Sequence, residues 1–315
     1  MSTLLVVQEG LGKVLIVPDA DACRGVAIAV GDKPHEIDVT PDGRTAFVSN
    51  FGLLEANYKI GTPGTTISVI DIERRVERTR FALPDGYTAP HGLKLRLPHG
   101  RELFTNTEQG TGAMVVLDAT SGNVLRSFAL PSGVHNFLFD AGGAQLFAFT
   151  LKGEVLRIDP ETGYVEARMM TGFPRGLAWT ADRQSLIASG RGELVFLRPT
   201  DLSIERRVTL PNVGQVFYPL AVRNTILAPA VLDGVLLAID AATGEVMRRI
   251  ETGSPLLLIA DPNGRDAWVS NVLVPAAMLG PTGIGRGGGV VRLDLDIFAI
   301  TRVSGTPDAN GLAVV

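Results

Sequence analysis

Short apolar stretches, each followed by turn-forming residues, recur along the whole chain. They are rich in Val, Ile, Leu and Phe, tend to alternate with small residues and extend over only a few positions, which is typical of β-strands. Examples are Ala46–Asn50, Leu103–Asn106, Leu146–Thr150 and Ala267–Asn271. Turns such as Thr40–Gly43 and Asp261–Gly264 contain Pro, which fixes φ, and Gly, which permits positive φ. The pattern predicts an all-β protein of short antiparallel strands.

The strands fall into groups of four, of which the third is the most regular. Its apolar run ends on an aspartate in five groups, and Arg198 takes that place in another. The aspartates are Asp71, Asp118, Asp159, Asp240 and Asp294. A turn such as Pro160–Gly163 follows, and then a charged alternating stretch such as Val165–Arg168. Such a stretch suits a solvent-facing edge strand.

A short motif begins the first strand of each group and repeats at a nearly even spacing. The seven copies are Pro34–Ile37, Pro90–Leu93, Val134–Phe137, Pro174–Leu177, Phe217–Leu220, Pro255–Leu258 and Ala309–Leu312. Their second positions lie 56, 44, 40, 43, 38 and 54 residues apart, and 40 more residues lead from Asn310 through the C-terminus to His35. A repeat of about 40–50 residues that holds several short strands is typical of a β-propeller. We therefore expect a seven-bladed β-propeller.

The two ends of the chain are expected to complete one blade together. Ala309–Val315 supplies only a first strand, whereas Leu4–Val7, Lys13–Val17 and Gly25–Val30 correspond to a second, third and fourth strand. A single repeat cannot bury its faces alone, so residues 1–315 are predicted to form one propeller domain. Its blades start near residues 34, 90, 134, 174, 216, 255 and 309, and 309–315 share the last blade with 3–30.

The motif Pro90–Leu93 (Pro-His-Gly-Leu), the turn Pro41–Gly43 (Pro-Asp-Gly) and the strand Phe47–Asn50 (Phe-Val-Ser-Asn) together resemble the YVTN-type seven-bladed β-propeller repeats. The resemblance covers the whole chain and implies the fold. Such repeats occur in lactonase-like enzymes, in virginiamycin B lyase-like enzymes, in electron-transfer subunits and in proteins without known activity. The resemblance therefore assigns no catalytic residue.

Composition narrows the class of protein. Hydrophobic residues make up 45% of the chain and charged residues 20%, which suits a folded core. The net charge of -4 and the lack of a basic run argue against nucleic acid or an anionic membrane as partner. With one cysteine, no signal-peptide pattern and no long apolar run, a cytoplasmic protein is expected. Nothing in the sequence sets the oligomeric state.

The residues that could carry out chemistry are predicted to lie at one end, or mouth, of the central channel of the propeller. In an antiparallel blade, the start of strand one, the end of strand two and the loop after strand two lie at the same end. His35, His91 and His135 occupy the first place, and the asparagines that end several second strands occupy the second. Two long insertions, Phe51–Gly64 and Val272–Gly288, occupy the third place, and they either act as lids or are surface loops without a function.

Three imidazoles at the same motif position of consecutive blades can point at one place and bind one metal ion. Nitrogen ligands favour zinc, iron, manganese, nickel or copper and suit calcium or magnesium poorly. We therefore predict a divalent transition metal bound by His35, His91 and His135. The alternative is that these histidines line a wet channel and bond to the backbone of neighbouring blades, or that one or two act in acid–base catalysis.

Other residues at this mouth are candidates for substrate binding. Arg175 and Tyr218 occupy the histidine phase in the next two blades, and Arg175 can hold an anionic group. Glu108 and Glu9 lie in loops beyond second strands and are candidates for a fourth ligand or a general base. Gly283–Gly288 matches GxGxxG but precedes a strand, so it does not indicate a nucleotide site.

The sequence thus predicts a metal-dependent lyase, lactone hydrolase or isomerase acting on a small oxygenated or carboxylated molecule. Arg175, Tyr218 and Glu108 are the predicted catalytic residues. Lone Cys23 and the absence of GxSxG give no support for covalent catalysis. The fourth histidine, His99, falls in a turn at the other mouth. The competing interpretation is a non-catalytic scaffold or binding propeller, and a third is a redox subunit or copper-type oxidase.

Overall fold

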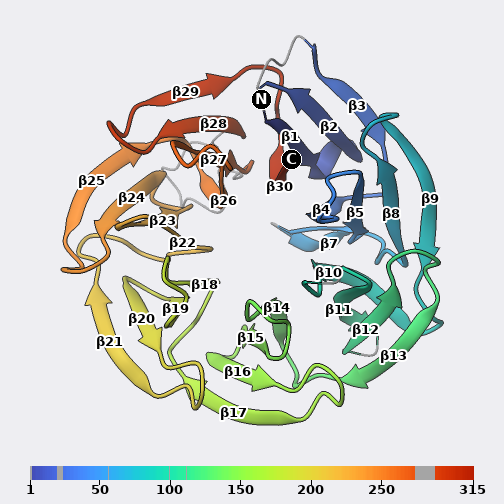
Figure 1. The fold of residues 1–315 in the computed structure, drawn as a ribbon, viewed down its shortest axis with the longest axis horizontal. Helices are drawn as coiled ribbons and strands as arrows, with labels where there is room; N and C mark the ends of the chain where they lie inside the picture. The colour runs from blue at the N-terminus through green and yellow to red at the C-terminus, as the bar shows by residue number, and fades with distance from the viewer. Residues whose placement is uncertain (1, 20–23, 56, 99, 111, 274–287) are drawn as a thin grey trace.

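Seven four-stranded antiparallel sheets form a closed ring in the computed structural model (Figure 1). The structure describes residues 2–19, 24–55, 57–98, 100–110, 112–273 and 288–315. Each sheet is a blade whose first strand lies next to the ring axis and whose fourth lies at the rim. The predicted all-β, seven-bladed β-propeller is confirmed.

The blades follow one another in chain order. Blade one contains β4 (Pro34–Val39), β5 (Thr45–Asn50), β8 (Thr66–Asp71) and β9 (Val76–Ala82). Blade two contains β10 (Tyr87–Leu95), β11 (Glu102–Gly110), β12 (Ala113–Asp118) and β13 (Val124–Ala129). Blade three contains β14 (Val134–Phe139), β15 (Leu146–Thr150), β16 (Glu154–Ile158) and β17 (Val165–Met170). Blade four contains β18 (Leu177–Trp179), β19 (Leu186–Ser189), β20 (Glu193–Leu197) and β21 (Ile204–Thr209).

The remaining blades complete the ring. Blade five contains β22 (Leu220–Val222), β23 (Thr225–Ala230), β24 (Val235–Asp240) and β25 (Val246–Glu251). Blade six contains β26 (Pro255–Ala260), β27 (Asp266–Asn271), β28 (Gly289–Asp294) and β29 (Ile300–Val303). Blade seven contains β30 (Ala309–Val314), β1 (Thr3–Gln8), β2 (Lys13–Pro18) and β3 (Val26–Ala29). A 3-10 turn, η1 (Glu9–Leu11), joins β1 to β2.

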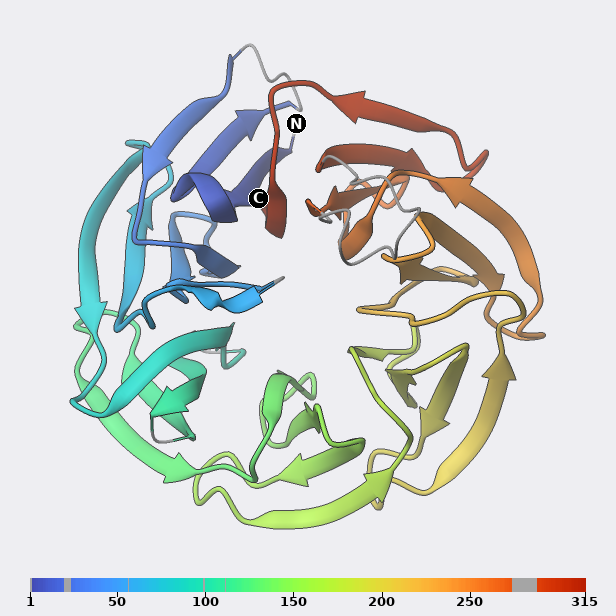
Figure 2. The same ribbon diagram turned by 180° about the vertical axis from the view of Figure 1, so that it is seen from behind.

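Blade seven closes the ring as the sequence predicts. The C-terminal strand β30 pairs antiparallel with β1, with Leu5 opposite Ala313 and Val6 opposite Leu312. Thr3 and Val315 exchange two backbone hydrogen bonds, of 2.7 and 3.0 Å. Both chain ends therefore lie beside each other in the same blade (Figure 2). Pairing between the two ends holds the ring shut without a covalent link.

The hydrophobic core lies between neighbouring blades. Each blade-to-blade interface has its own cluster of buried aliphatic and aromatic residues. At the closure, for example, Leu5 and Ile16 of blade seven pack against Ile37 and Val48 of blade one. Burying such a side chain contributes about 1.5–3 kcal/mol. A blade removed from the ring would expose apolar residues on both of its faces.

The turn after the third strand recurs between blades for a local reason, since the aspartate that ends or follows that strand accepts backbone N–H groups of the turn. Asp118 Oδ1 accepts from Ser121 N at 2.7 Å and from Thr120 N at 3.1 Å, and Asp240 Oδ1 accepts from Thr243 N at 2.7 Å. These bonds stabilise the turn from the third to the fourth strand.

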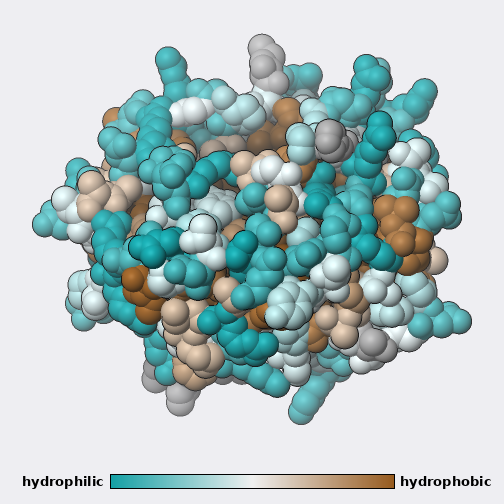
Figure 3. Space-filling view, turned by 60° about the horizontal axis from the view of Figure 1, so that its bottom comes forward, coloured by the Kyte–Doolittle hydropathy of each residue, from teal (hydrophilic) through white to brown (hydrophobic). Residues whose placement is uncertain are grey.

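The surface face in Figure 3 is mostly hydrophilic, with hydrophobic residues scattered among polar ones. Within the described part of the chain, no helix has the length and apolar character needed to cross a bilayer.

Candidate metal centre

The three motif histidines lie at irregular points in their strands. The register of the first strand shifts between Pro34 and Ile37, and the same place in blades two and three shows an equivalent shift. A bulge of this kind re-aims a side chain that would otherwise follow the pleat. His35, His91 and His135 fall at these bulges, which gives one physical reason for their common orientation.

The three imidazoles form a stack. Ring centroids of His35 and His91 are 4.1 Å apart, and those of His91 and His135 are also 4.1 Å apart. The rings are tilted by 38° and 39°, and all three residues are buried. Phe51 contacts His35 and His91 edge-on, and Phe149 does the same to His135. The stack is therefore enclosed by apolar rings.

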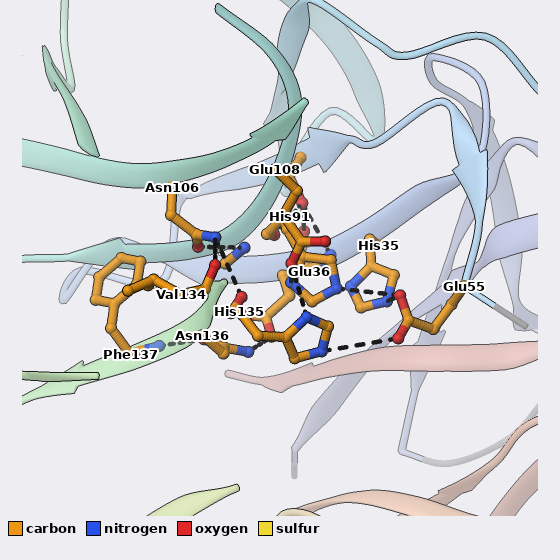
Figure 4. A network of polar contacts seen from close by, with 12 residues as sticks. His35, Glu36, Glu55, His91, Asn106, Glu108, Val134, His135, Asn136 and Phe137 are labelled. Carbon is orange, nitrogen blue, oxygen red and sulfur yellow. Dashed lines mark hydrogen bonds and ion pairs between the residues drawn. The ribbon is translucent and has the colours of Figure 1, made fainter. Parts of the chain in front are cut away.

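Glu55, from the first insertion, lies along the Nε2 edge of this stack (Figure 4). Its Oε2 is 3.2 Å from His91 Nε2 and 3.5 Å from His35 Nε2, and its Oε1 is 3.7 Å from His135 Nε2. One carboxylate thus faces an Nε2 atom of each of the three histidines.

The insertion folds as a small hairpin that holds Glu55 in place. β6 (Leu53–Leu54) pairs with β7 (Asn57–Gly61), which reaches from blade one toward the ring axis (Figure 2). Phe51 and Leu53 pack with Ala89 in a buried cluster beneath it. Glu55 N donates to Glu9 Oε1 at 2.7 Å, which ties the hairpin to blade seven.

Glu108 lies along the opposite, Nδ1 edge of the stack. Its Oε1 is 2.7 Å from His135 Nδ1 and 3.7 Å from His91 Nδ1. Tyr58 Oη links the two carboxylates, at 2.8 Å from Glu108 Oε2 and 3.1 Å from Glu55 Oε2. The sequence predicts a loop position for Glu108, but the residue belongs to the long strand β11 and its side chain is largely buried.

Burial and neighbouring charges separate the pKa values of the imidazoles. Burial, and then the proximity of His91, lowers the pKa of His35 to about 3. Burial also opposes protonation of His91, but the charge of Glu108 and the hydrogen bond to Glu55 outweigh it and raise the pKa of His91 to about 9. His35 is therefore neutral at pH 7, with a lone pair available for a ligand.

The pKa values of the acidic groups around the stack are shifted in different directions. Burial opposes ionisation of Glu55, but its hydrogen bond to His91 and the nearby imidazoles lower its pKa. Burial also opposes ionisation of Glu108, but the charges of His91 and His135 outweigh burial and lower the pKa of Glu108. Burial raises the pKa of Glu9 to about 7, although the hydrogen bond from the backbone N–H of Glu55 opposes the rise. Burial, and then the charge of Glu55, raise the pKa of Tyr58 well above its usual value.

Several buried nitrogens of this cluster have no hydrogen-bond partner among the described residues. They are Nδ1 and Nε2 of His35 and Nδ1 of His91. Leaving a buried polar group unpaired costs about 1–3 kcal/mol. His35, Glu55 and His91 have donor atoms within 4.8 Å of one another, and so do His91, Glu108 and His135. Imidazole and carboxylate donors suit divalent transition metals, so these groups could hold a metal ion.

The donor groups differ from the set expected from sequence. Each combines two histidines with one glutamate, because the stack places His35 and His135 on opposite sides of His91. Glu55 and Tyr58 were not predicted as site residues. Their only sequence signal is their position in the insertion over the histidine mouth.

A cavity of about 400 Å³ opens beside the stack. The residues that line this cavity include His35, Glu55, His135, Arg175 and Tyr218. Arg175 Nη1 donates to the carbonyl of Pro174 at 3.2 Å, and no ion pair joins Arg175 to another described residue. Its remaining donors are therefore available to a ligand within this part of the structure.

Both residues precede their blade's first strand instead of opening it. β18 starts at Leu177 and β22 at Leu220, although the motif predicts strands from Pro174 and Phe217. Pro219 follows Tyr218 and has no N–H to donate to a neighbouring strand, which disfavours regular strand pairing at this point. Both side chains nevertheless line the cavity, as the shared phase predicts.

Tyr218 also ends a polar network inside the channel. Asn136 Nδ2 donates to Tyr218 Oη at 3.4 Å and bonds to Glu36 Oε1. Lys94 Nζ is 2.7 Å from Glu36 Oε2, and although burial opposes it, this cation helps lower the pKa of Glu36 to about 2. Glu36 was not singled out from the sequence, although it directly follows His35.

The strand-two asparagines are structural. Asn50 Oδ1 accepts the backbone N–H of Gly31 at 3.0 Å, and Asn106 Oδ1 accepts that of Gly92 at 2.9 Å. Asn271 Nδ2 donates to the carbonyl of Gly289 at 3.2 Å. They brace backbone segments instead of presenting polar groups to the channel mouth.

Some predictions fall on positions outside the described residues. These positions are His99, Cys23 and most of the second insertion, including most of the glycine-rich Gly283–Gly288.

Two solved structures are similar to this chain in fold. A chain of the dihydro-heme d1 dehydrogenase NirN in complex with DHE is 15% identical, with a TM-score of 0.69 over 99% of this chain and 74% of that chain. A chain of the mitotic checkpoint complex is 14% identical, with a TM-score of 0.65 over 85% of this chain and 75% of that chain. No family model matches the sequence, and no curated protein matches it. These likenesses support the propeller fold alone.

Proposed function

We propose that this protein is a metal-dependent enzyme that acts on a small oxygenated or carboxylated molecule in the cavity beside the histidine stack. The observation that carries the proposal is the Nε2 edge of the stack. There, His35 Nε2 is buried without a hydrogen-bond partner, next to His91 Nε2 and the Glu55 carboxylate. Of these residues, His35 and Glu55 line a cavity large enough for a small organic molecule.

His35, His91 and Glu55 would hold the ion, which leaves further coordination positions toward the cavity. A divalent transition metal supplies a Lewis acid that polarises a carbonyl or lowers the pKa of bound water. Elimination by a lyase, opening of a lactone and isomerisation next to a carbonyl all build negative charge on oxygen. The geometry suits this group of reactions.

The remaining cavity residues have supporting roles in this proposal. Arg175 pairs with the carboxylate of the substrate, because its guanidinium has donors to spare. Tyr218 donates a hydrogen bond from its phenol, since burial and then the charge of Glu36 raise its pKa and keep it protonated. Glu108 acts as a positioning residue through its contact with His135 Nδ1.

We further propose that the chain is a single-domain member of the YVTN-type propellers. The full-length ring of repeats and the Pro-His-Gly-Leu motif support this assignment. Similar propellers occur in a dehydrogenase and in a checkpoint assembly, so the fold does not choose between an enzyme and a binding module. The side chains of the site favour the enzyme.

Elemental analysis of purified protein, before and after incubation with Zn²⁺, Mn²⁺ or Co²⁺ and dialysis, tests the metal. We expect retained metal in the parent protein and in His99→Ala, which removes the fourth histidine of the chain. Glu55→Gln keeps the size of the side chain but should weaken retention, and His35→Ala should weaken it further. The melting temperature of each metal-free variant shows whether it is folded.

Metal-dependent turnover of a panel of lactones and hydroxy acids tests the reaction. Protein that binds no ion under any of these conditions contradicts the proposal and favours the non-catalytic binding propeller. If the parent protein and a variant that lacks Arg175 both bind metal but neither turns over any member of the panel, the proposed substrate class is wrong.

A further inference from the structure

The two donor groups of the centre meet at a single residue. His91 faces Glu55 and His35 with its Nε2, and faces Glu108 and His135 with its Nδ1. The two nitrogens of an imidazole point away from each other, so no single ion can use both. The stack therefore offers two separate places for a cation, one on each edge.

We infer that the centre is dinuclear, with His91 bridging two metal ions as an imidazolate. The ion on the cavity side is the one already proposed, and in that respect the inference rests on the proposed function. The ion on the inner side is new, and its ligands are His91 Nδ1, His135 Nδ1 and Glu108.

The inner edge has the features of a built site. His91 is completely buried, and its Nδ1 has no hydrogen-bond partner among the described residues. Glu108 Oε1 lies 3.7 Å from this nitrogen but 2.7 Å from His135 Nδ1, so one acceptor serves two nitrogens unequally. An ion among the three donors would satisfy all of them at once.

Charge supports two cations. Glu55 and Glu108 are joined through Tyr58, and Glu36 carries a third carboxylate close to the histidines. To bridge two ions, His91 must release the protons of both ring nitrogens to solvent, and the resulting imidazolate carries one negative charge, as metal ligands must be deprotonated. The ligands then carry three negative charges, from Glu55, Glu108 and the imidazolate, because Glu36 is already paired to Lys94. They offset most of the charge of two divalent ions.

The two places differ in access. His35 and Glu55 line the cavity, so an ion there can meet a substrate. Glu108 lies behind the stack with a side chain that is only 8% exposed, and Phe51 and Phe149 flank the imidazoles. Of the ligands proposed for the inner ion, His135 lines the cavity whereas His91 and Glu108 do not, so this ion would be less open to substrate. Its role would be to fix His91 and to tune the cavity-side ion through the shared ring.

Metal stoichiometry tests the inference on the intact protein. We expect two Cu²⁺ or Co²⁺ ions per chain in the parent protein and in the control His99→Ala. Glu108→Gln should retain one ion, on the cavity side, and His35→Ala should retain one on the inner side. His91→Ala should lose the bridge and retain less than either.

Electron paramagnetic resonance of the Cu²⁺-loaded parent protein gives a readout that does not depend on a variant folding. An imidazolate bridge couples the two spins antiferromagnetically, so the signal should fall far below the copper content at low temperature. Loaded Glu108→Gln should instead show the full signal of an isolated ion.

One ion per chain, with a full signal and no change in Glu108→Gln, overturns the second ion and leaves the proposed function intact. Two ions with uncoupled signals overturn the bridge. No bound ion overturns both proposals.

Discussion

Buried ionisable side chains decide the chemistry of this protein at the residue scale. His35 and His91 are alike in sequence context and in burial, yet their pKa values move in opposite directions. The difference arises because Glu108 and Glu55 both reach His91 closely, whereas His35 faces only Glu55 among these two. A metal ion on either edge therefore competes with a proton on His91.

Arg175 should control affinity for carboxylates. With metal-loaded protein and benzoate as the probe, Arg175→Gln should weaken binding by about 1.5–3 kcal/mol, the usual contribution of a hydrogen bond to a charged group. Isothermal titration calorimetry measures the change, and metal content should stay the same. Arg191→Gln is the control, because Arg191 lies over the ring of Phe173 and is exposed. Equal loss in both variants contradicts the role of Arg175.

Asp266 should make stability depend on pH at acid values. Burial opposes its ionisation, but Arg292 Nη2 at 2.6 Å and Asn263 Nδ2 at 2.9 Å outweigh it and lower its pKa. Because the folded pKa lies below the unfolded one, the carboxylate stabilises the protein above about pH 4, and this is lost as pH falls further.

Urea unfolding at several acid pH values measures this effect. The free energy of unfolding of Asp266→Asn should fall less steeply between about pH 5 and pH 2 than that of the parent protein. Asp85→Asn, which changes an exposed turn residue, should retain the steeper parent dependence. An unchanged slope in Asp266→Asn would count against the ion pair.

At the scale of elements, the β6–β7 hairpin is a functional addition to a blade that is complete without it. β5 and β8 pair along their whole length, from Thr45 opposite Asp71 to Asn50 opposite Thr66. The hairpin carries Glu55 and Tyr58 and touches the ring through the cluster of Phe51, Leu53 and Ala89.

Replacing residues 53–61 by a short glycine-rich turn should therefore separate stability from metal binding. The free energy of unfolding of metal-free protein should fall by only about 1.5–3 kcal/mol, the contribution of one buried leucine. The cavity-side metal should be lost, as elemental analysis would show. Ile60→Ser changes a hairpin residue that is 48% exposed and should alter neither quantity. Full metal retention after the replacement would exclude Glu55 as a ligand.

The innermost strands approach each other so closely that the third motif position admits no side chain at the ring closure. A Cβ on Gly311 would meet the carbonyl oxygen of His35 at 2.5 Å, so β30 or β4 would have to move. Gly311→Ala should cost about 1–3 kcal/mol in unfolding free energy, as overpacking of a dense core does.

Gly142→Ala is the matched control, since its Cβ would meet nothing nearer than Asp140 Oδ2 at 3.8 Å. Denaturant unfolding of both variants measures the difference. Equal stability of Gly311→Ala and Gly142→Ala would show that the closure tolerates the extra methyl group.

At the scale of the whole molecule, closure of the ring should make the fold cooperative. Deleting residues 309–315 removes β30 and exposes the edge of β1 as well as two inter-blade clusters. We expect this chain to lose its sharp thermal transition, because every blade depends on both neighbours. A chain extended by as many residues after Val315 should melt like the parent protein. Circular dichroism follows both, and a cooperative transition in the truncated chain would contradict the prediction.

Sequence patterns were sufficient for the architecture because they act locally and repeat. Strand alternation, the Pro–Gly turns and the closing aspartates are each set within a few residues, and the even spacing of the motif together with the shared last blade indicates a ring. The same repetition correctly placed His35, His91 and His135 side by side. It also placed Arg175 and Tyr218 at the same mouth, although their blades start late.

Only the tertiary structure decided how those side chains meet. Glu55 and Tyr58 sit in an insertion that has no counterpart in the repeat, so no periodicity reveals that they reach His91 and Glu108. The distances between the imidazole rings, and the ring nitrogens that each carboxylate contacts, depend on bulges in three different blades. The chain by itself therefore determined the ring and the phase of the histidines, whereas long-range packing decided the donor groups, since distances between remote segments are set only when all blades have closed.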